Sequence, residues 1–223
     1  MNRYENVVAH SGREAVSSNK VLKNTYLLLS ATIGFSAVTA MISMAIGVPP
    51  IAYIVSLIVA MVLGIFVLPK AANSANGIGV IFLITGLLGF GLGPILSQYL
   101  ALPNGPQVIA TAFAGTGIIF LGLSGYALTS KRDFSFMGGF LFAGMMVVVL
   151  AMIGNLFLQM PALSLAVSSG IILLMSGFIL FDTSRMINNP QQTNYIMMTV
   201  SLYLNIFNIF VSLLQLLGIA SDD

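Results

Sequence analysis

Residues 71–130 read AANSANGIGVIFLITGLLGFGLGPILSQYLALPNGPQVIATAFAGTGIIFLGLSGYALTS and contain no charged side chain. Three more intervals of this 223-residue chain, 24–69, 134–181 and 186–221, are also uncharged. A soluble fold of this composition would expose large apolar patches, whereas a bilayer core about 30 Å thick requires about 20 apolar residues per helix. The sequence therefore predicts a protein that crosses the membrane several times.

Prolines and polar turns divide these uncharged intervals into single spans, because two helices within one interval still need a turn at the membrane surface. The sequence predicts an all-α polytopic membrane protein with seven transmembrane helices, at about 22–46, 51–69, 77–100, 107–129, 136–159, 162–187 and 194–219. Residues 22–220 then form one seven-helix transmembrane domain. The polar residues before it, 1–21, are expected to form a flexible N-terminal tail.

The basic residues predict the orientation of the chain in the membrane. All eight lie before the first span or in alternate turns, at Arg3, Arg13, Lys20, Lys23, Lys70, Lys131, Arg132 and Arg185. Short loops rich in Lys and Arg stay in the cytoplasm. We therefore expect a cytoplasmic N-terminus and a periplasmic C-terminus, and the net charge of +2 reflects this topology and not affinity for nucleic acid.

Several classes of enzyme are disfavoured because the groups that their chemistry needs are missing from the sequence. The segment Gly122-Leu123-Ser124-Gly125 matches intramembrane serine proteases, but a serine nucleophile needs an adjacent base and His10 is the only histidine. Aspartyl proteolysis needs two carboxyl groups in one site, and only Asp182 lies within a span. With one His and no Cys, a transition-metal site has almost no ligands. We expect no enzymatic activity, no metal site and no cofactor.

Gly89 and Gly93 form a GxxxG pattern in the third predicted span. Small residues four positions apart allow two helix backbones to approach closely. Pro94 follows directly and is expected to kink the helix. The pattern favours helix packing, and the alternative is a hinge or broken helix that lines a cavity, as in transporters.

The last predicted span carries a seam of polar residues. Its members are Asn194, Ser201, Asn205, Asn208, Ser212 and Gln215. At 100° per residue they fall within roughly 80° of one another, so they share one helix face. Such groups are costly in hydrocarbon, and the seam is therefore expected to face the other helices. It forms either interhelical hydrogen bonds or a water-accessible path for an ion or proton.

Asp182 is the only acidic residue inside a predicted span, near the end of the sixth helix. Intramembrane carboxyl groups are commonly functional. One interpretation is a structural pair with Arg185, which lies three residues further on the same helix surface. The other is a titrating gate or cation contact, with Asp182, Arg185, Asn205 and Asn208 as candidate residues.

Several short motifs occur in order along the whole chain. They are Val21-Leu22-Lys23-Asn24-Thr25-Tyr26, Gly93-Pro94-Ile95-Leu96, Phe181-Asp182-Thr183-Ser184, Thr193-Asn194-Tyr195, Ser201-Leu202-Tyr203 and Asn208-Ile209-Phe210. These motifs resemble the signatures of the Bax inhibitor-1 family, the transmembrane Bax inhibitor motif proteins, and of its bacterial YccA branch. The resemblance implies a central seventh helix wrapped by the other six.

The resemblance also implies two possible functions. Calcium-leak members of the family carry two aspartates whose shared protonation controls a pore. Asp182 matches the first of them, but Asn205 stands at the second position, and an amide does not titrate. A pH-sensitive calcium or proton leak with Asp182 as the titrating residue is therefore the alternative function.

The YccA branch is associated with modulation of the AAA+ membrane protease FtsH. The resemblance implies a protein of the bacterial inner membrane that binds FtsH and its associated membrane complex and limits degradation of other membrane proteins. A polar N-terminal tail in the cytoplasm fits a handle that such a protease engages. Besides the lipid bilayer, FtsH is the expected partner.

Overall fold

The computed structural model describes residues 2–219, and their side chains from Ser18 onward. Seven helical segments are long and apolar enough to cross a membrane: Ser18–Ala45, Ile51–Ala71, Asn76–Leu100, Gly105–Ser130, Ser135–Leu158, Pro161–Asn188 and Tyr195–Ile219. The all-α fold with seven spans is confirmed among the described residues, and the predicted bounds agree within two residues except at the start of the first span, where one helix runs continuously from Asn2. The predicted periplasmic C-terminus, 221–223, lies outside the described residues.

Eight α-helices and three short helical turns make up these spans and their connections. The α-helices are α1 (Asn2–Ala45), α2 (Ile51–Val62), α3 (Leu68–Ala71), α4 (Asn76–Leu100), α5 (Gly105–Ser130), α6 (Gly138–Leu158), α7 (Pro161–Asn188) and α8 (Tyr195–Ile219). The turns are the π-helical η1 (Leu63–Val67) and the 3₁₀ turns η2 (Ser135–Met137) and η3 (Pro190–Gln192). The π turn ends two residues before Pro69, which cannot donate a hydrogen bond within the helix.

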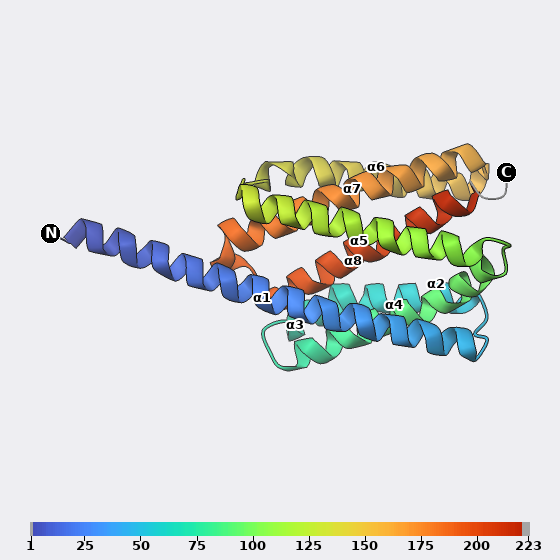
Figure 1. Ribbon diagram of the computed structural model, residues 1–223, viewed down its shortest axis with the longest axis horizontal. Coiled ribbons are helices and arrows are strands. Elements are labelled where there is room, and N and C mark those ends of the chain that lie inside the picture. Colours follow the sequence, from blue (N-terminus) through green and yellow to red (C-terminus); the bar gives the residue numbers. More distant parts are fainter. Residues whose placement is uncertain (1, 220–223) are drawn as a thin grey trace.

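The bundle has two groups of three helices with α8 between them. Helices α1, α2 and α4 lie on one side of α8, and α5, α6 and α7 lie on the other (Figure 1). Helix α8 contacts α1, α4, α5 and α7, while α2 packs against α4 and α6 against α7. The central position predicted for the last helix is confirmed, and α2 and α6 occupy the periphery.

Glycines allow α4 to pack closely against α1. A Cβ atom at Gly89 would overlap with the backbone oxygen of Ser36, and one at Gly93 would overlap with the side chain of Ser43. Helix α4 continues without interruption through Pro94 to Leu100. The arrangement supports the packing interpretation of the GxxxG pattern and shows no broken helix at Pro94.

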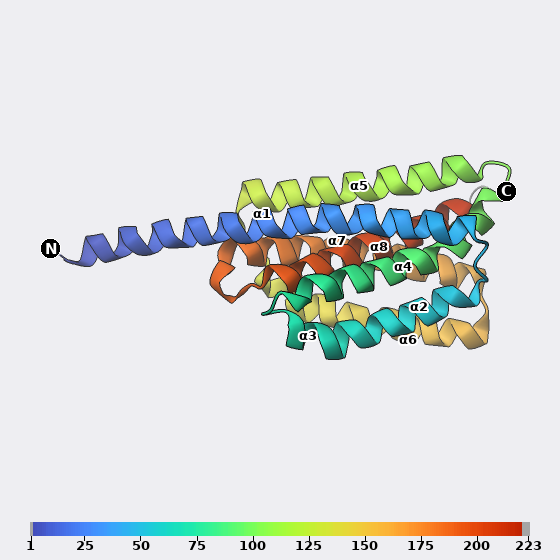
Figure 2. The ribbon, with the colours of Figure 1, turned by 90° about the horizontal axis from the view of Figure 1, so that it is seen from below.

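Helix α1 extends beyond the bundle at its N-terminal end. It is one continuous helix from Asn2 and projects away from the other helices (Figures 1 and 2). The backbone of residues 2–21 is therefore helical. The first span is already helical, so the residues before it extend an existing helix and avoid the cost of nucleating a new one. The flexibility of this tail stays a prediction.

The basic residues among the described side chains gather at one end of the bundle. Lys20 and Lys23 begin the first span, Lys70 lies in α3, Lys131 and Arg132 follow α5, and Arg185 lies in the last turn of α7. These points lie at the end from which α1 projects (Figure 1). The alternation of basic turns in the sequence predicts this arrangement. Which side of the membrane this end faces stays a prediction.

Candidate functional site

Asp182 lies buried between α7 and α8. It is six residues before the end of α7 at Asn188, about 9 Å along the helix axis, and its side chain is 3% exposed. Its Oδ2 atom accepts hydrogen bonds from Ser201 Oγ at 2.6 Å and from Asn205 Nδ2 at 3.2 Å. Three of the predicted site residues thus meet in one cluster, which joins the two helices.

Arg185 contacts an aromatic ring of its own helix. Its guanidinium lies over the ring of Phe181, with Cζ 5.5 Å from the ring centroid, in a cation–π contact. Helix positions three apart differ in direction by about 60°. Asp182 is therefore turned towards α8 while Arg185 remains partly exposed. Ser201 and Asn205 of α8 are thus the hydrogen-bond partners of Asp182, and a structural pair between Asp182 and Arg185 stays a prediction.

The next two residues of α7 contact two other parts of the bundle. Thr183 Oγ1 lies 3.5 Å from the hydroxyl of Tyr26 in α1. Ser184 Oγ donates to the backbone oxygen of Arg132 at 3.1 Å and accepts from the backbone N–H of Phe134 at 2.9 Å. Consecutive helix residues point about 100° apart, so residues 182–184 reach α8, α1 and the α5–α6 loop in turn.

The rest of the polar seam is also turned into the bundle. Gln215 Oε1 accepts a hydrogen bond from Ser168 Oγ of α7 at 2.7 Å. Asn208 Nδ2 donates to the backbone oxygen of Leu204 in its own helix at 2.8 Å. Ser212 is buried, and none of the seam residues is exposed. The seam therefore hydrogen-bonds to α7 at two levels, near Asp182 and near Ser168.

Asn194 has a different place from the other seam residues, because it precedes α8. Its Oδ1 atom accepts the backbone N–H of Ile196 at 2.8 Å, as a helix-capping side chain does. Its Nδ2 atom donates to the backbone oxygen of Ala72 at 3.0 Å and to Asn73 Oδ1 at 2.8 Å. Asn194 therefore anchors the start of α8 to the α3–α4 loop.

A second buried cluster was not predicted from the sequence. The Tyr203 hydroxyl of α8 lies 2.6 Å from Ser36 Oγ of α1 and donates to the backbone oxygen of Thr85 in α4 at 3.3 Å. A buried tyrosine hydroxyl usually finds a partner. A tyrosine in an uncharged predicted span indicates a hydroxyl that needs a buried partner. The sequence does not show which partner it finds, because Ser36 and Thr85 lie far away along the chain.

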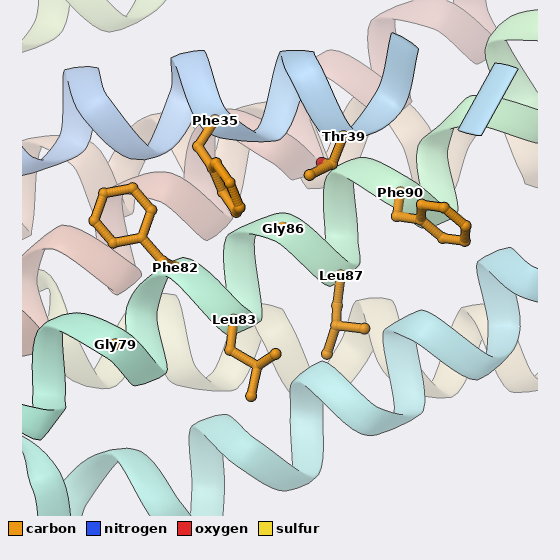
Figure 3. A pocket seen from close by; sticks show the side chains of 8 residues that line it. All are labelled: Phe35, Thr39, Gly79, Phe82, Leu83, Gly86, Leu87 and Phe90. Atoms are coloured by element: carbon orange, nitrogen blue, oxygen red, sulfur yellow. The ribbon is translucent and has the colours of Figure 1, made fainter. Parts of the chain in front are cut away.

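The outer face of α1 and α4 carries an apolar hollow of about 440 Å³ (Figure 3). Its lining residues are Phe35, Thr39, Gly79, Phe82, Leu83, Gly86, Leu87 and Phe90. The one hydroxyl among them, that of Thr39, donates to the backbone oxygen of Ser36 at 2.9 Å. The hollow thus presents hydrocarbon and offers no group for catalysis.

The site has the chemistry of a hydrogen-bonded helix contact. Asp182 meets two donors, and the described side chains place no second carboxyl group beside it, because Asn205 offers its amide N–H₂ there. Two carboxyl groups that share a proton are the basis of coupled titration. A role for Asp182, Arg185, Asn205 or Asn208 in an ion or proton gate stays a prediction.

Comparison with known proteins covers nearly the whole chain. Residues 18–222 match the family described as "Inhibitor of apoptosis-promoting Bax1". An uncharacterized membrane protein of Vibrio cholerae serotype O1 is 52% identical over 208 residues, which cover 93% of each chain. The "Modulator of FtsH protease YccA" of Escherichia coli strain K12 is 49% identical over 215 residues, which cover 96% of this chain and 97% of the relative. The "Inner membrane protein YccA" of Escherichia coli O6:H1 has the same identity and coverage.

Proposed function

This chain belongs to the Bax inhibitor-1 family, and on that basis we propose that it binds and modulates the AAA+ membrane protease FtsH. By doing so it limits the degradation of other membrane proteins, and it catalyses no reaction itself. The observation that carries this proposal is the 49% identity, over 96% of the chain, to a relative named as a modulator of FtsH. The proposed location is the bacterial inner membrane, with the N-terminus in the cytoplasm and the C-terminus in the periplasm.

The shape of the molecule supports engagement through its N-terminal segment. Residues 2–17 continue α1 beyond the first span, a length of about 24 Å as a helix. A protease with a cytoplasmic ATPase can reach this segment without entering the bilayer. While FtsH holds this chain, another membrane substrate cannot occupy the same channel, and its degradation slows.

The packed bundle supports slow extraction of this chain, because FtsH must separate the helices of any chain that it extracts. Three contacts between helices resist that separation here: the Asp182 cluster, the hydrogen bond from Ser168 to Gln215, and the close approach of α1 to α4 at Gly89. Each interhelical hydrogen bond in a membrane contributes about 0.6 kcal/mol on average. Slow extraction prolongs the time for which the protease is occupied.

Deleting residues 2–16 is expected to slow the FtsH-dependent turnover of this chain, because the protease loses the segment that it engages first. The half-life of the protein is measured after synthesis is stopped, in cells with and without FtsH. The turnover of a second membrane substrate is followed in the same cells and is expected to change. An unchanged half-life for both proteins, with the deletion variant still folded by circular dichroism, would exclude the tail as the handle.

A leak of calcium ions or protons is the alternative function, and the geometry does not favour it. A pore gated by shared protonation needs a second acid beside Asp182, and Asn205 occupies that place as a donor. The polar seam makes hydrogen bonds to α7 that a hydrated path would have to open.

A further inference from the structure

The loop between α5 and α6 is held in place by side chains of α7. The backbone oxygen of Arg132 accepts hydrogen bonds from Ser184 Oγ at 3.1 Å and from Asn188 Nδ2 at 3.4 Å. The backbone N–H of Phe134 donates to the same Ser184 oxygen at 2.9 Å. Lys131 ends α5 in the left-handed conformation, with φ of 51°, so the chain turns sharply into the loop. The position of this loop is therefore fixed relative to α7.

Positive charge is in excess around this loop. Lys131 and Arg132 are both exposed, and Arg185 lies on α7 between the two residues that bind the loop backbone. The nearby acid, Asp133, accepts the backbone N–H of Ser135 through Oδ1 at 2.9 Å. Between positions 18 and 219 the only other acid is Asp182, which is buried and bonded to α8. The loop and the last turn of α7 thus carry three cations and one exposed carboxylate, that of Asp133.

Exposed aromatic side chains follow the two loop cations within ten residues of the sequence. Phe136 in η2 is 81% exposed and Phe140, four residues later at the start of α6, is 71% exposed. Both belong to the membrane-spanning segment that begins at Ser135. The loop therefore carries exposed cations just before the start of this span and exposed apolar rings within its first six residues. A ligand that satisfies both has an anionic headgroup attached to hydrocarbon.

We propose that Lys131, Arg132 and Arg185 form a binding site for the headgroup of an anionic phospholipid, whose acyl chains pack against Phe136 and Phe140. Arginine binds phosphate oxygens through two parallel N–H donors, and basic pockets between transmembrane helices are suited to lipid headgroups. The hydrogen bonds from Ser184 and Asn188 fix the loop backbone at Arg132 to the part of α7 that carries Arg185. The site is independent of the proposed binding of FtsH.

The test measures lipid retention by the purified full-length protein with native mass spectrometry, using phosphatidylglycerol and phosphatidylcholine as probes. Wild type is expected to retain phosphatidylglycerol in preference to phosphatidylcholine. Replacing both loop cations, in the variant Lys131→Gln with Arg132→Gln, is expected to weaken phosphatidylglycerol binding at least tenfold, because each cation near a membrane surface contributes about 1 kcal/mol. An unchanged affinity would overturn the proposal.

A matched control separates this site from general attraction to positive charge. The double variant Lys20→Gln with Lys70→Gln removes the same charge from the same end of the bundle and is expected to keep the wild-type affinity. An equal loss in this control would show that binding is nonspecific. Ser184→Ala keeps every charge but releases the loop, and is expected to weaken binding by a smaller factor. Displacement of phosphatidylglycerol by an equal concentration of inorganic phosphate would show a simple anion site and overturn the lipid assignment.

Discussion

Replacing Gly89 with alanine is expected to lower the free energy of unfolding by about 1 to 3 kcal/mol, the usual cost of overpacking a close contact. The added Cβ atom would overlap with the backbone oxygen of Ser36, which cannot move without moving α1. The two helices must therefore separate, and the contact between Ser36 and Tyr203 would be strained as well. The measurement is reversible unfolding of the purified protein in mixed micelles.

The same helix provides the control for this experiment. A Cβ atom at Gly79 would have no atom within 4 Å, so Gly79→Ala changes the residue in the same way without a steric conflict. This control is expected to be as stable as wild type or slightly more stable, because alanine favours a helix more than glycine does. Equal stability of the Gly89 and Gly79 variants would contradict the close approach of α1 and α4.

Replacing Asp182 with alanine is expected to cost about 1 to 3 kcal/mol of stability, because the Ser201 hydroxyl and the Asn205 amide lose their buried acceptor. Asp182→Asn is expected to cost less, since its Oδ1 atom can still accept one of the two hydrogen bonds. Both variants are compared with wild type by the same unfolding measurement. If Asp182→Ala were as stable as wild type, the cluster would not hold α7 against α8.

Ion flux through the same proteins separates the two candidate functions. Wild type and Asp182→Asn are reconstituted into liposomes that contain dyes for calcium and for pH. If the chain modulates a protease and conducts no ions, neither protein raises the flux above that of empty liposomes between about pH 6 and 8. Flux that depends on Asp182 would instead favour the leak and would show that a single aspartate is sufficient for it.

The number and order of the spans could be predicted because they depend on local properties of the sequence. Uncharged intervals fix where helices can lie in a bilayer, and prolines such as Pro103 and Pro161 mark the turns. The inward direction of the seam also follows from spacing along one helix, since Ser201, Asn205 and Ser212 recur at helical periods.

The contacts within the site could not be predicted, because they depend on how distant segments meet. Arg185 lies over Phe181 and Asp182 is bonded to Ser201, and these contacts depend on where α8 lies. The hydrogen bond from Ser184 to Arg132 joins residues 52 positions apart. Asn194 follows the period of the seam but lies before α8, where the cap determines its contacts.

The most direct test of the account is the rate at which purified FtsH degrades a second membrane protein when this chain is present in the same proteoliposomes. The amount of this chain is increased while FtsH and its substrate are held constant. If this chain modulates FtsH, the initial rate of degradation falls with each addition and reaches a plateau as FtsH becomes saturated. A rate that stays constant at every ratio, with this chain correctly inserted and folded, would contradict modulation of FtsH.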